Sequence, residues 1–460
     1  MRWALFEDSA VEGLAPLVLA RPAFELRCGR MTLRERLLRH TQSADWGALV
    51  RAYLVEAYQE DCPDCHLNDL EWLEAAETLF VNARWVPPTN WKPALDRSAV
   101  GRQGGSIVYL TVTPGEANEL RGRTVGDWLE ALALRRHDVS ATGTLLSRPW
   151  DLVTRNADQL REDFDDCLRG HESPGKNALG GIPAGSNGVP GHATHCPGHP
   201  GAELRTGNSE FRFGPDVAIV GPADRLWIHP TARIDPYVVI DTQEGPVTIE
   251  ADVRVLSFTR LEGPCHVGQG SELFRAHVRA GTTIGPVCRV GGEIEASILH
   301  GYVNKYHDGF LGHSYLCPWV NLGAETTTSD LKSDYSPVAV PLEGEPIDTG
   351  LTKVGSFIGD HTKTALGCLF NTGSSIGVWC TILPAGPLLP KFIPSFTSIW
   401  HGRLTHGLDF DRLAEAARTA MSRRGREFTP AQRRLYRTLF DLTAEERERA
   451  IHRHETSRAI

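Results

Sequence analysis

The sequence has no long apolar run and no excess of basic residues. Its 460 residues carry 48 Lys and Arg against 57 Asp and Glu, a formal net charge of −9. A nucleic-acid-binding protein usually carries surplus positive charge to neutralise phosphates, so nucleic acid is not expected as a main partner. No stretch approaches the roughly 20 consecutive apolar residues of a membrane span, so none is expected either.

The first residues, MRWALFEDSAVEG, also lack the apolar core of a secretory signal peptide. We therefore expect a cytoplasmic protein whose ten cysteines are reduced thiols. A chain of this length is expected to form two or three domains rather than one.

Composition changes abruptly at two places. Residues 170–210 are rich in Gly, Pro and His and hold almost no bulky apolar side chains, which is typical of a flexible linker. After Arg403 the sequence becomes rich in Arg and Glu in a helical pattern. We predict a first domain over 1–169, a linker over 170–210, a second domain over 211–402 and a helical appendage over 403–460.

Apolar residues recur at every sixth position between residues 228 and 383, often followed by glycine, as in Val267-Gly, Ile284-Gly and Ile376-Gly. A period of six fits neither a helix nor a two-sided strand. It is the repeat of a parallel β-helix, in which each hexad forms one flat side of a coil. The apolar residue should point inward, and glycine is expected where a Cβ would clash at a tight corner. The polar stretch 332–352 interrupts the repeat and predicts a projecting loop.

Two histidines of this region are candidate general bases. Transfer of an acyl group to an amine or hydroxyl needs a base for the acceptor's proton and donors for the carbonyl oxygen. His307 lies outside the hexad register beside Asp308, and His313 lies six residues further on. We expect His307 to be the base, with His313 as the alternative, and Gly309 and Gly312 to offer N–H groups to the oxyanion.

The stretch 305–324, KYHDGFLGHSYLCPWVNLGA, carries a family resemblance. It resembles the acetyltransferase half of the bifunctional bacterial UDP-N-acetylglucosamine pyrophosphorylase/glucosamine-1-phosphate acetyltransferase family, whose motif runs Lys, His, Tyr-Leu-Gly-Asp, then Asn-Ile-Gly-Ala-Gly. Upstream, Val278-Arg279-Ala-Gly is similar to the family's phosphate-binding Leu-Arg-Pro-Gly. Near the N-terminus, Leu19-Ala-Arg21-Pro22 and the later Leu26-Arg-Cys-Gly are similar to a divergent branch of that family.

This resemblance implies an α/β nucleotidyltransferase-like N-terminal domain, an all-β left-handed parallel β-helix of hexapeptide repeats and a small C-terminal helical tail. It implies acetyl-CoA as cosubstrate and a sugar phosphate or nucleotide sugar as acceptor. It places substrate binding at Arg279, Lys305, Asn321 and Asp330. It also implies a homotrimer, which would bury the large apolar residues of the repeats, Trp319, Phe357 and Trp379.

Several positions depart from the family pattern. The family's second phosphate-binding lysine falls at Glu295, which would repel a sugar phosphate. In the N-terminal domain the phosphate-cradling Gly-x-Gly-Thr-Arg loop is replaced by Glu7-Asp8-Ser-Ala-Val-Glu-Gly. The strand that should end in a Mg²⁺-binding Asp ends in Asn82. We expect nucleotidyl transfer to be weak or absent, with Mg²⁺ needed only if this domain is active.

Two other function classes stay open. One is a non-catalytic binder or scaffold for a sugar nucleotide or acyl-CoA. The other is a zinc lyase of the carbonic-anhydrase kind that also uses a β-helix, with ligands at His300, His307 and His313. Cys317 is expected to be structural.

Three further motifs are weaker. Cys62-Pro-Asp-Cys65-His matches the text of a haem-attachment site, which we do not expect without export. A zinc site could pair Cys62 and Cys65 with linker residues, namely His195, Cys196 or His199. The run Arg423-Arg-Gly-Arg-Glu is interpreted as a solvated face, with phosphate binding as the alternative.

Overall fold

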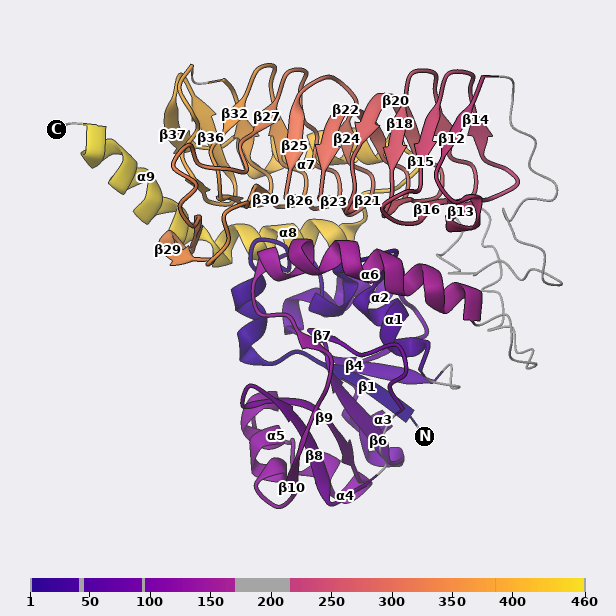
Figure 1. Ribbon diagram of the computed structural model, residues 1–460. Coiled ribbons are helices and arrows are strands. Elements are labelled where there is room, and N and C mark those ends of the chain that lie inside the picture. The colour runs from indigo at the N-terminus through magenta and orange to yellow at the C-terminus, as the bar shows by residue number, and fades with distance from the viewer. Residues whose placement is uncertain (1, 41–44, 93–95, 170–215, 385, 459–460) are drawn as a thin grey trace. The chain divides into compact units, whose positions relative to one another are not determined.

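The computed structural model describes residues 2–40, 45–92, 96–169, 216–384 and 386–458 (Figure 1). The predicted linker, 170–210, lies outside the described residues. The chain divides into two compact units. The first comprises Met1–Leu26, Met31–Arg148 and Pro430–Thr438, and the second comprises Arg27–Arg30, Pro149–Thr429 and Leu439–Ile460. The predicted domain boundaries stay predictions.

The first unit contains a seven-stranded sheet in the order β10-β8-β9-β6-β1-β4-β5. Its strands are β1 (Arg2–Phe6), β4 (Trp46–Leu49), β5 (His66–Leu67), β6 (Thr78–Asn82), β8 (Ala99–Gln103), β9 (Ser106–Val112) and β10 (His137–Ser140), and β7 (Trp85–Val86) pairs with β11 (Thr144–Leu145). The strands β6, β1, β4 and β5 are parallel, and β9 runs antiparallel to both neighbours. The helices are α1 (Leu33–Leu38), α2 (Val55–Asp61), α3 (Leu70–Ala75), α4 (Pro114–Asn118) and α5 (Val125–Ala133).

The central strands of this sheet are buried on both faces. All of β6 and the last four residues of β1 are buried, which explains their nearly continuous apolar sequence. On one face, Phe80 packs edge-on against Trp128 of α5, with 5.3 Å between ring centroids. The first unit is therefore an α/β domain, as predicted.

The second unit is a parallel β-helix with three sheets, here called faces A, B and C. Face A contains β14 (Arg233–Ile234), β17 (Arg254–Val255), the first halves of β20 (Glu272–Val278) and β22 (Arg289–Glu295), β24 (Asn304–Lys305), β31 (Lys363–Thr364), β34 (Thr381–Ile382) and β36 (Thr397–Trp400), with β37 (Arg403–His406) antiparallel at its end. Face B contains β12 (Ala218–Val220), β15 (Val239–Asp241), β18 (Arg260–Glu262), the second halves of β20 and β22, β25 (Phe310–Gly312), β27 (Thr327–Thr328) and β32 (Leu369–Phe370). Face C contains β13 (Leu226–Ile228), β16 (Val247–Ile249), β19 (Cys265–Val267), β21 (Thr282–Ile284), β23 (Ile298–Leu299), β26 (Tyr315–Leu316), β30 (Ser356–Ile358), β33 (Ser374–Ile376) and β35 (Phe392–Ile393).

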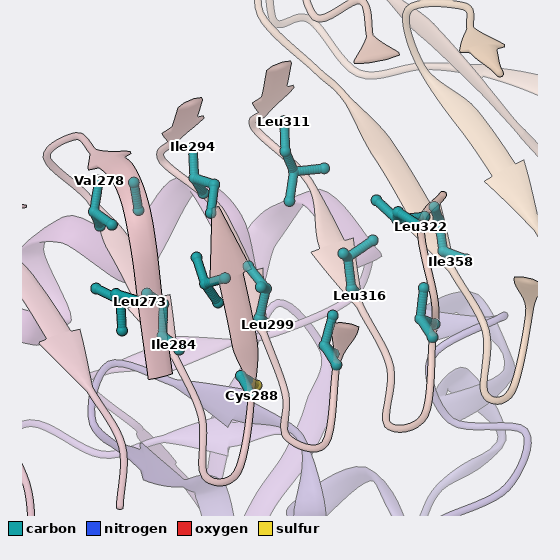
Figure 2. Packing of buried hydrophobic residues seen from close by; sticks show 14 of the residues in the cluster. Leu273, Val278, Ile284, Cys288, Ile294, Leu299, Leu311, Leu316, Leu322 and Ile358 are labelled. Atoms are coloured by element: carbon teal, nitrogen blue, oxygen red, sulfur yellow. The ribbon is translucent and has the colours of Figure 1, made fainter. Parts of the chain in front are cut away.

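The hexad residues stack in columns inside these coils, as the repeat predicted. Figure 2 shows Val278, Ile294 and Leu311 in one column and, below them, the column that contains Leu299 and Leu316. All of these side chains are fully buried. The fold class predicted from the repeat and the resemblance is thus confirmed.

Glycines allow neighbouring coils to approach closely. A Cβ on Gly285 would lie 2.0 Å from the carbonyl oxygen of His300, so any larger residue would push two coils apart. The same corner, between faces C and A, also holds bulky residues with left-handed backbone, including Tyr302, Trp319 and Trp379. Their stacked rings offset this backbone strain, with 4.3 Å between the centroids of Tyr302 and Trp319.

The predicted projecting loop is present between faces B and C of one coil. It contains the hairpin β28 (Ala339–Leu342) and β29 (Glu345–Asp348), and a bridge between Leu331 and Lys353 closes its base. The chain therefore leaves and rejoins the coil at adjacent points.

Within the second unit, helices pack on the β-helix. In α6 (Pro149–Arg169), Asn156 donates to Gly281 O (2.8 Å), and Trp150 packs against Phe357 of face C, with 6.3 Å between ring centroids. The tail forms α7 (Phe410–Ser422), α8 (Pro430–Leu442) and α9 (Ala444–Arg458), and Phe410 stacks on Trp379. The chain itself thus buries Phe357 and Trp379, so their size does not require a trimer. Across the described ranges, no helix is both long and apolar enough to span a bilayer.

Candidate active site

Charged residues of successive coils line up at the corner between faces B and C. Arg279 follows β20, Glu295 ends β22, His313 follows β25, and Asp330 lies where the projecting loop begins. Since parallel strands of adjacent coils lie about 4.8 Å apart, these side chains form one continuous row.

His313 and Asp330 form a hydrogen-bonded pair in this row. The Nδ1 atom of His313 lies 2.7 Å from Oδ2 of Asp330, and the Asp330 residue is only 8% exposed. His313 has left-handed backbone (φ 45°) and a side chain that is 20% exposed, so its ring is reachable from solvent. A carboxylate on Nδ1 fixes the tautomer that leaves Nε2 as the proton acceptor.

The base of the projecting loop holds this pair in place. The N–H of Val354 donates to the carbonyl of Asp330 (2.8 Å), and that of Gly355 donates to the carbonyl of His313 (3.0 Å). Gly312 leaves the space that the carboxylate occupies, because a Cβ there would lie 2.3 Å from Asp330 Oδ2. The N–H of Gly312 donates to Thr328 Oγ1 (3.2 Å), so the prediction that it serves an oxyanion is wrong.

Arg279 and Glu295 neutralise each other next to the pair. One guanidinium nitrogen of Arg279 bonds the Glu295 carboxylate and lies 3.3 Å from Glu293 Oε1. Lys353, where the projecting loop rejoins the coil, lies 3.3 Å from the other Glu295 oxygen. Sequence reasoning missed Lys353. The sequence could have indicated Lys353, because it lies where the hexads resume after the loop, just as Asp330 lies where they stop before it.

His307 lies at a different corner, between faces A and B. It is exposed, and its ring contacts that of Tyr306 edge-on, with 6.0 Å between centroids. Within the described part of the chain no carboxylate, including the neighbouring Asp308, hydrogen-bonds the His307 ring. The structure therefore does not bring together the two histidines that the sequence singled out.

Lys305 is buried in the β-helix, 2% exposed, rather than open to a substrate. Its Nζ donates to the carbonyls of Gly291 (2.8 Å) and His307 (2.9 Å), which places it as a support for the corner that carries His307. Burial lowers the pKa of Lys305 to about 8, with Asp308 and Glu325 acting in the opposite direction.

Asn321 lies on face A, away from the row of His313. Asn304 Nδ2 donates to its Oδ1 (2.5 Å), and the two backbones form a bridge, so the pair is an asparagine ladder between coils. The histidines proposed for a zinc lyase, His300, His307 and His313, follow strands of faces C, A and B respectively. They therefore lie at three different corners of the β-helix.

The described residues contain no group of three or more His, Cys, Asp or Glu side chains arranged for a metal. Cys317 is fully buried, as expected of a structural cysteine. Cys62 and Cys65 hydrogen-bond each other, which lowers the pKa of Cys62. The linker residues suggested as their zinc partners, His195, Cys196 and His199, lie outside the described residues.

In the first unit, the acids that replace the phosphate cradle are held by the chain's own groups. Glu7 accepts the N–H of Ala23 (2.8 Å) and forms an ion pair with Arg51 (3.1 Å). Asp8 forms an ion pair with the buried Arg84 (2.6 Å) and accepts from Asn82 Nδ2 (2.8 Å). The donors that would suit phosphate oxygens, such as Arg51 and Arg84, are therefore already engaged by the carboxylates of Glu7 and Asp8.

Comparison with known proteins gives one family match and several relatives. Residues 3–172 match the family described as Sugar nucleotidyl transferase. A Bifunctional sugar-1-phosphate nucleotidylyltransferase/acetyltransferase of Sulfurisphaera tokodaii is 32% identical over 144 residues, which are 31% of this chain and 36% of that protein. An Uncharacterized acetyltransferase YaiX of Escherichia coli is 27% identical over 162 residues, 35% of this chain and 65% of that protein. The chain thus spans less than two thirds of either relative.

A solved UDP-N-acetylglucosamine acyltransferase of Arabidopsis is 14% identical with a TM-score of 0.22, over 47% of this chain and 77% of that one. The resemblance predicted from the motifs is confirmed by the family match and the curated relatives. Over residues 3–172 this chain matches the sugar nucleotidyl transferase family, and it is similar to a divergent branch of the bifunctional sugar-1-phosphate nucleotidyltransferase/acetyltransferase family.

Proposed function

We propose that the β-helix unit is an acyltransferase that moves an acetyl or other acyl group from acyl-CoA to a sugar phosphate or nucleotide sugar. The observation that carries this proposal is the 2.7 Å hydrogen bond between His313 Nδ1 and the buried carboxylate of Asp330. The acetyltransferase names of two relatives support the same class of reaction.

In this proposal His313 is the general base and Asp330 positions it. Nε2 of His313 takes the proton from the acceptor's amine or hydroxyl as that atom attacks the thioester carbonyl. The new C–N or C–O bond forms, the C–S bond breaks, and the imidazolium returns the proton to the departing thiolate. Asp330 stabilises the imidazolium while it carries the positive charge. The structure therefore favours His313 over His307 as the base.

The charges beside His313 favour a nucleotide sugar over a sugar 1-phosphate as acceptor. Arg279 and Lys353 both bind Glu295, so neither cation is free to bind a phosphate next to the reacting atom. In a nucleotide sugar the phosphates can lie further from the acylated amine or hydroxyl. An acceptor with its negative charge at a distance avoids repulsion from Glu295.

We propose that the first unit does not transfer nucleotides. Glu7 and Asp8 are neutralised by Arg51 and Arg84, and Asn82 stands where a Mg²⁺-binding carboxylate is expected. Mg²⁺ prefers carboxylate and phosphate oxygens with several waters retained. These engaged side chains do not fit that ion, so no step is assigned to it.

The test is a screen of acetyl-CoA against amino-sugar phosphates and nucleotide amino sugars, with release of the coenzyme A thiol as the readout. His313→Ala should lower kcat by ~10²–10⁴-fold, the range for a lost general base. His307→Ala is the matched control and should retain most activity. The reverse result would move the base to His307. Saturable acyl-CoA binding with no turnover on any acceptor would support the non-catalytic binder instead.

Assembly and location are also proposals. We propose a homotrimer, because acyltransferases built on a β-helix place their clefts between neighbouring prisms. We also propose a cytoplasmic location. Face C is covered in part by α6, so subunits would pack mainly through the other faces. Light scattering that gives a monomer mass at micromolar concentration would contradict the trimer.

A further inference from the structure

The end of α7 carries two adjacent arginines, of which Arg424 is half-buried and Arg423 is exposed. Arg423 and Arg424 follow the last residue of α7, and the N–H of Arg424 donates to the carbonyl of Met421 (2.9 Å). Met421 is buried, 2% exposed, so this end of the helix is packed. Lys363 of face A donates to the carbonyl of Ala416 (3.4 Å), which places α7 against that face. The backbone that carries both arginines is therefore held by packed structure.

Face A presents a third arginine to the same region. Arg289 occupies the row of outward residues that runs from Glu272 through Arg289 to Asn304, one per coil. Its Nη1 donates to the carbonyls of Gly270 and Cys288, at 3.1 Å each. These contacts orient the guanidinium toward the corner between faces C and A without neutralising it.

The three arginines have no carboxylate of their own. Glu272 is the acid of this row, and its oxygens bind Arg254 (2.9 Å) and the hydroxyl of Tyr306 (2.8 Å). Among the residues that the structure describes, no carboxylate lies within ion-pair distance of Arg289, Arg423 or Arg424. Burial, followed by the positive charges of Arg289 and Arg423, lowers the pKa of Arg424. Arg289 and Arg424 are half-buried, whereas Arg423 is exposed. Guanidinium groups that repel one another at such a partly buried place are stabilised when an anion lies between them.

Groups suited to the rest of a ligand lie in the next two coils. The amides of Asn304 and Asn321 face outward in the same row, and both residues are half-buried. At the adjoining corner the stacked rings of Tyr302 and Trp319 are also half-buried, with an interplanar angle of 19°. Planar rings next to a cationic cluster suit a ligand that carries both phosphates and an aromatic base.

We propose that Arg289, Arg423 and Arg424 bind the phosphates of a nucleoside diphosphate group. Guanidinium groups bind phosphate oxygens through pairs of parallel hydrogen bonds, and three of them match the charge of a diphosphate. This site lies at the corner between faces C and A, whereas His313 lies between faces B and C. It gives the Arg-rich run at the end of α7 a role other than that of a solvated face.

The proposal is tested by isothermal titration of the full chain with ADP, UDP and inorganic pyrophosphate at low salt. Arg289→Gln and Arg424→Gln should each weaken nucleoside diphosphate binding roughly tenfold or more, as expected for a lost charge-assisted hydrogen bond. Arg424→Lys should weaken it less, because the charge stays while the paired hydrogen bonds are lost. A preference for ADP or for UDP identifies the source of the group as a coenzyme or a nucleotide sugar.

Arg418→Gln is the control, because Arg418 lies on the exposed side of α7 in an ion pair with Glu415 (2.7 Å). Its affinity should equal that of the wild type. The proposal is overturned if none of the three probes binds, or if Arg289→Gln and Arg424→Gln proteins with wild-type circular dichroism bind as tightly as the unmodified chain. Binding is measured without turnover, so the outcome does not depend on the proposed acyl transfer.

Discussion

Replacing Gly312 with Ala should separate His313 from Asp330 without removing either group. A Cβ on Gly312 would lie 2.3 Å from Asp330 Oδ2 and 2.5 Å from the Phe310 ring. Non-bonded heavy atoms prefer about 3.5 Å, so the carboxylate must move by about 1 Å. The 2.7 Å hydrogen bond to His313 cannot survive such a shift unchanged. Because a misplacement of about 1 Å can cost ~10²-fold in rate, we expect kcat to fall about 10²-fold.

The measurement is steady-state release of coenzyme A thiol with the best acceptor found in the screen. The KM for the acceptor should change little, because in the proposed mechanism Asp330 acts through His313. Asp330→Asn, which keeps the shape and removes the charge, should show the same loss of kcat at unchanged KM. Gly126→Ala is the control, since a Cβ there meets no atom within 4 Å. Wild-type kcat in both Gly312→Ala and Asp330→Asn would refute the role of this pair.

Three further outcomes are expected. Burial lowers the pKa of Lys305 in the folded protein to about 8, whereas the ordinary value is about 10.4. Between these pH values the unfolded chain binds more protons than the folded one. Lys305 therefore makes the free energy of unfolding rise with pH in this range. The free energy of unfolding in urea, measured between about pH 8 and pH 10.4, should rise by up to about 3 kcal/mol more in the wild type than in Lys305→Met. Equal pH dependence of the two proteins would contradict the low pKa. Glu295→Gln should release Lys353 and remove one of the two carboxylates that hold Arg279, and so lower the KM for a hexosamine 1-phosphate roughly tenfold. An unchanged KM would show that Glu295 does not exclude phosphate. The intact chain should release no pyrophosphate from UTP, Mg²⁺ and a hexosamine 1-phosphate, and turnover that is lost on deletion of residues 1–168 would show an active first unit.

The β-helix was predictable because its period is local. Each inward residue, such as Ile294 or Leu311, contacts the equivalent residue of the next coil, so one repeating position reports the whole architecture. The helices that cover the coils were not predictable in the same way. Nothing in the hexads shows that Trp150 of α6 would pack on Phe357, or that Phe410 would stack on Trp379.

The candidate site was only partly predictable for a related reason. His313 and Asp330 were both singled out, but their pairing depends on which residues of successive coils share a corner. The separation of 17 residues between His313 and Asp330 is not a whole number of hexads, so the repeat alone does not show that they share a corner. The projecting loop obscures the position of Lys353 instead, since it returns the chain there after an excursion whose length has no fixed relation to the repeat. The acids of the first unit were visible, but their partners Arg51 and Arg84 are far away in sequence, at separations of 44 and 76 residues.

The row of charged residues at the corner between faces B and C has a regular spacing. Arg279, Glu295, His313 and Asp330 occupy successive coils, so their spacing is fixed by the backbone pitch of about 4.8 Å and not by side-chain packing. Inserting one whole coil between Glu295 and His313 would lengthen the gap by that amount and leave each corner unchanged. In the proposed acyl transfer, the distance between His313 and the charged residues of the other coils therefore changes only in steps of one coil. Adding or removing repeats would alter that distance while His313 and Asp330 stay paired.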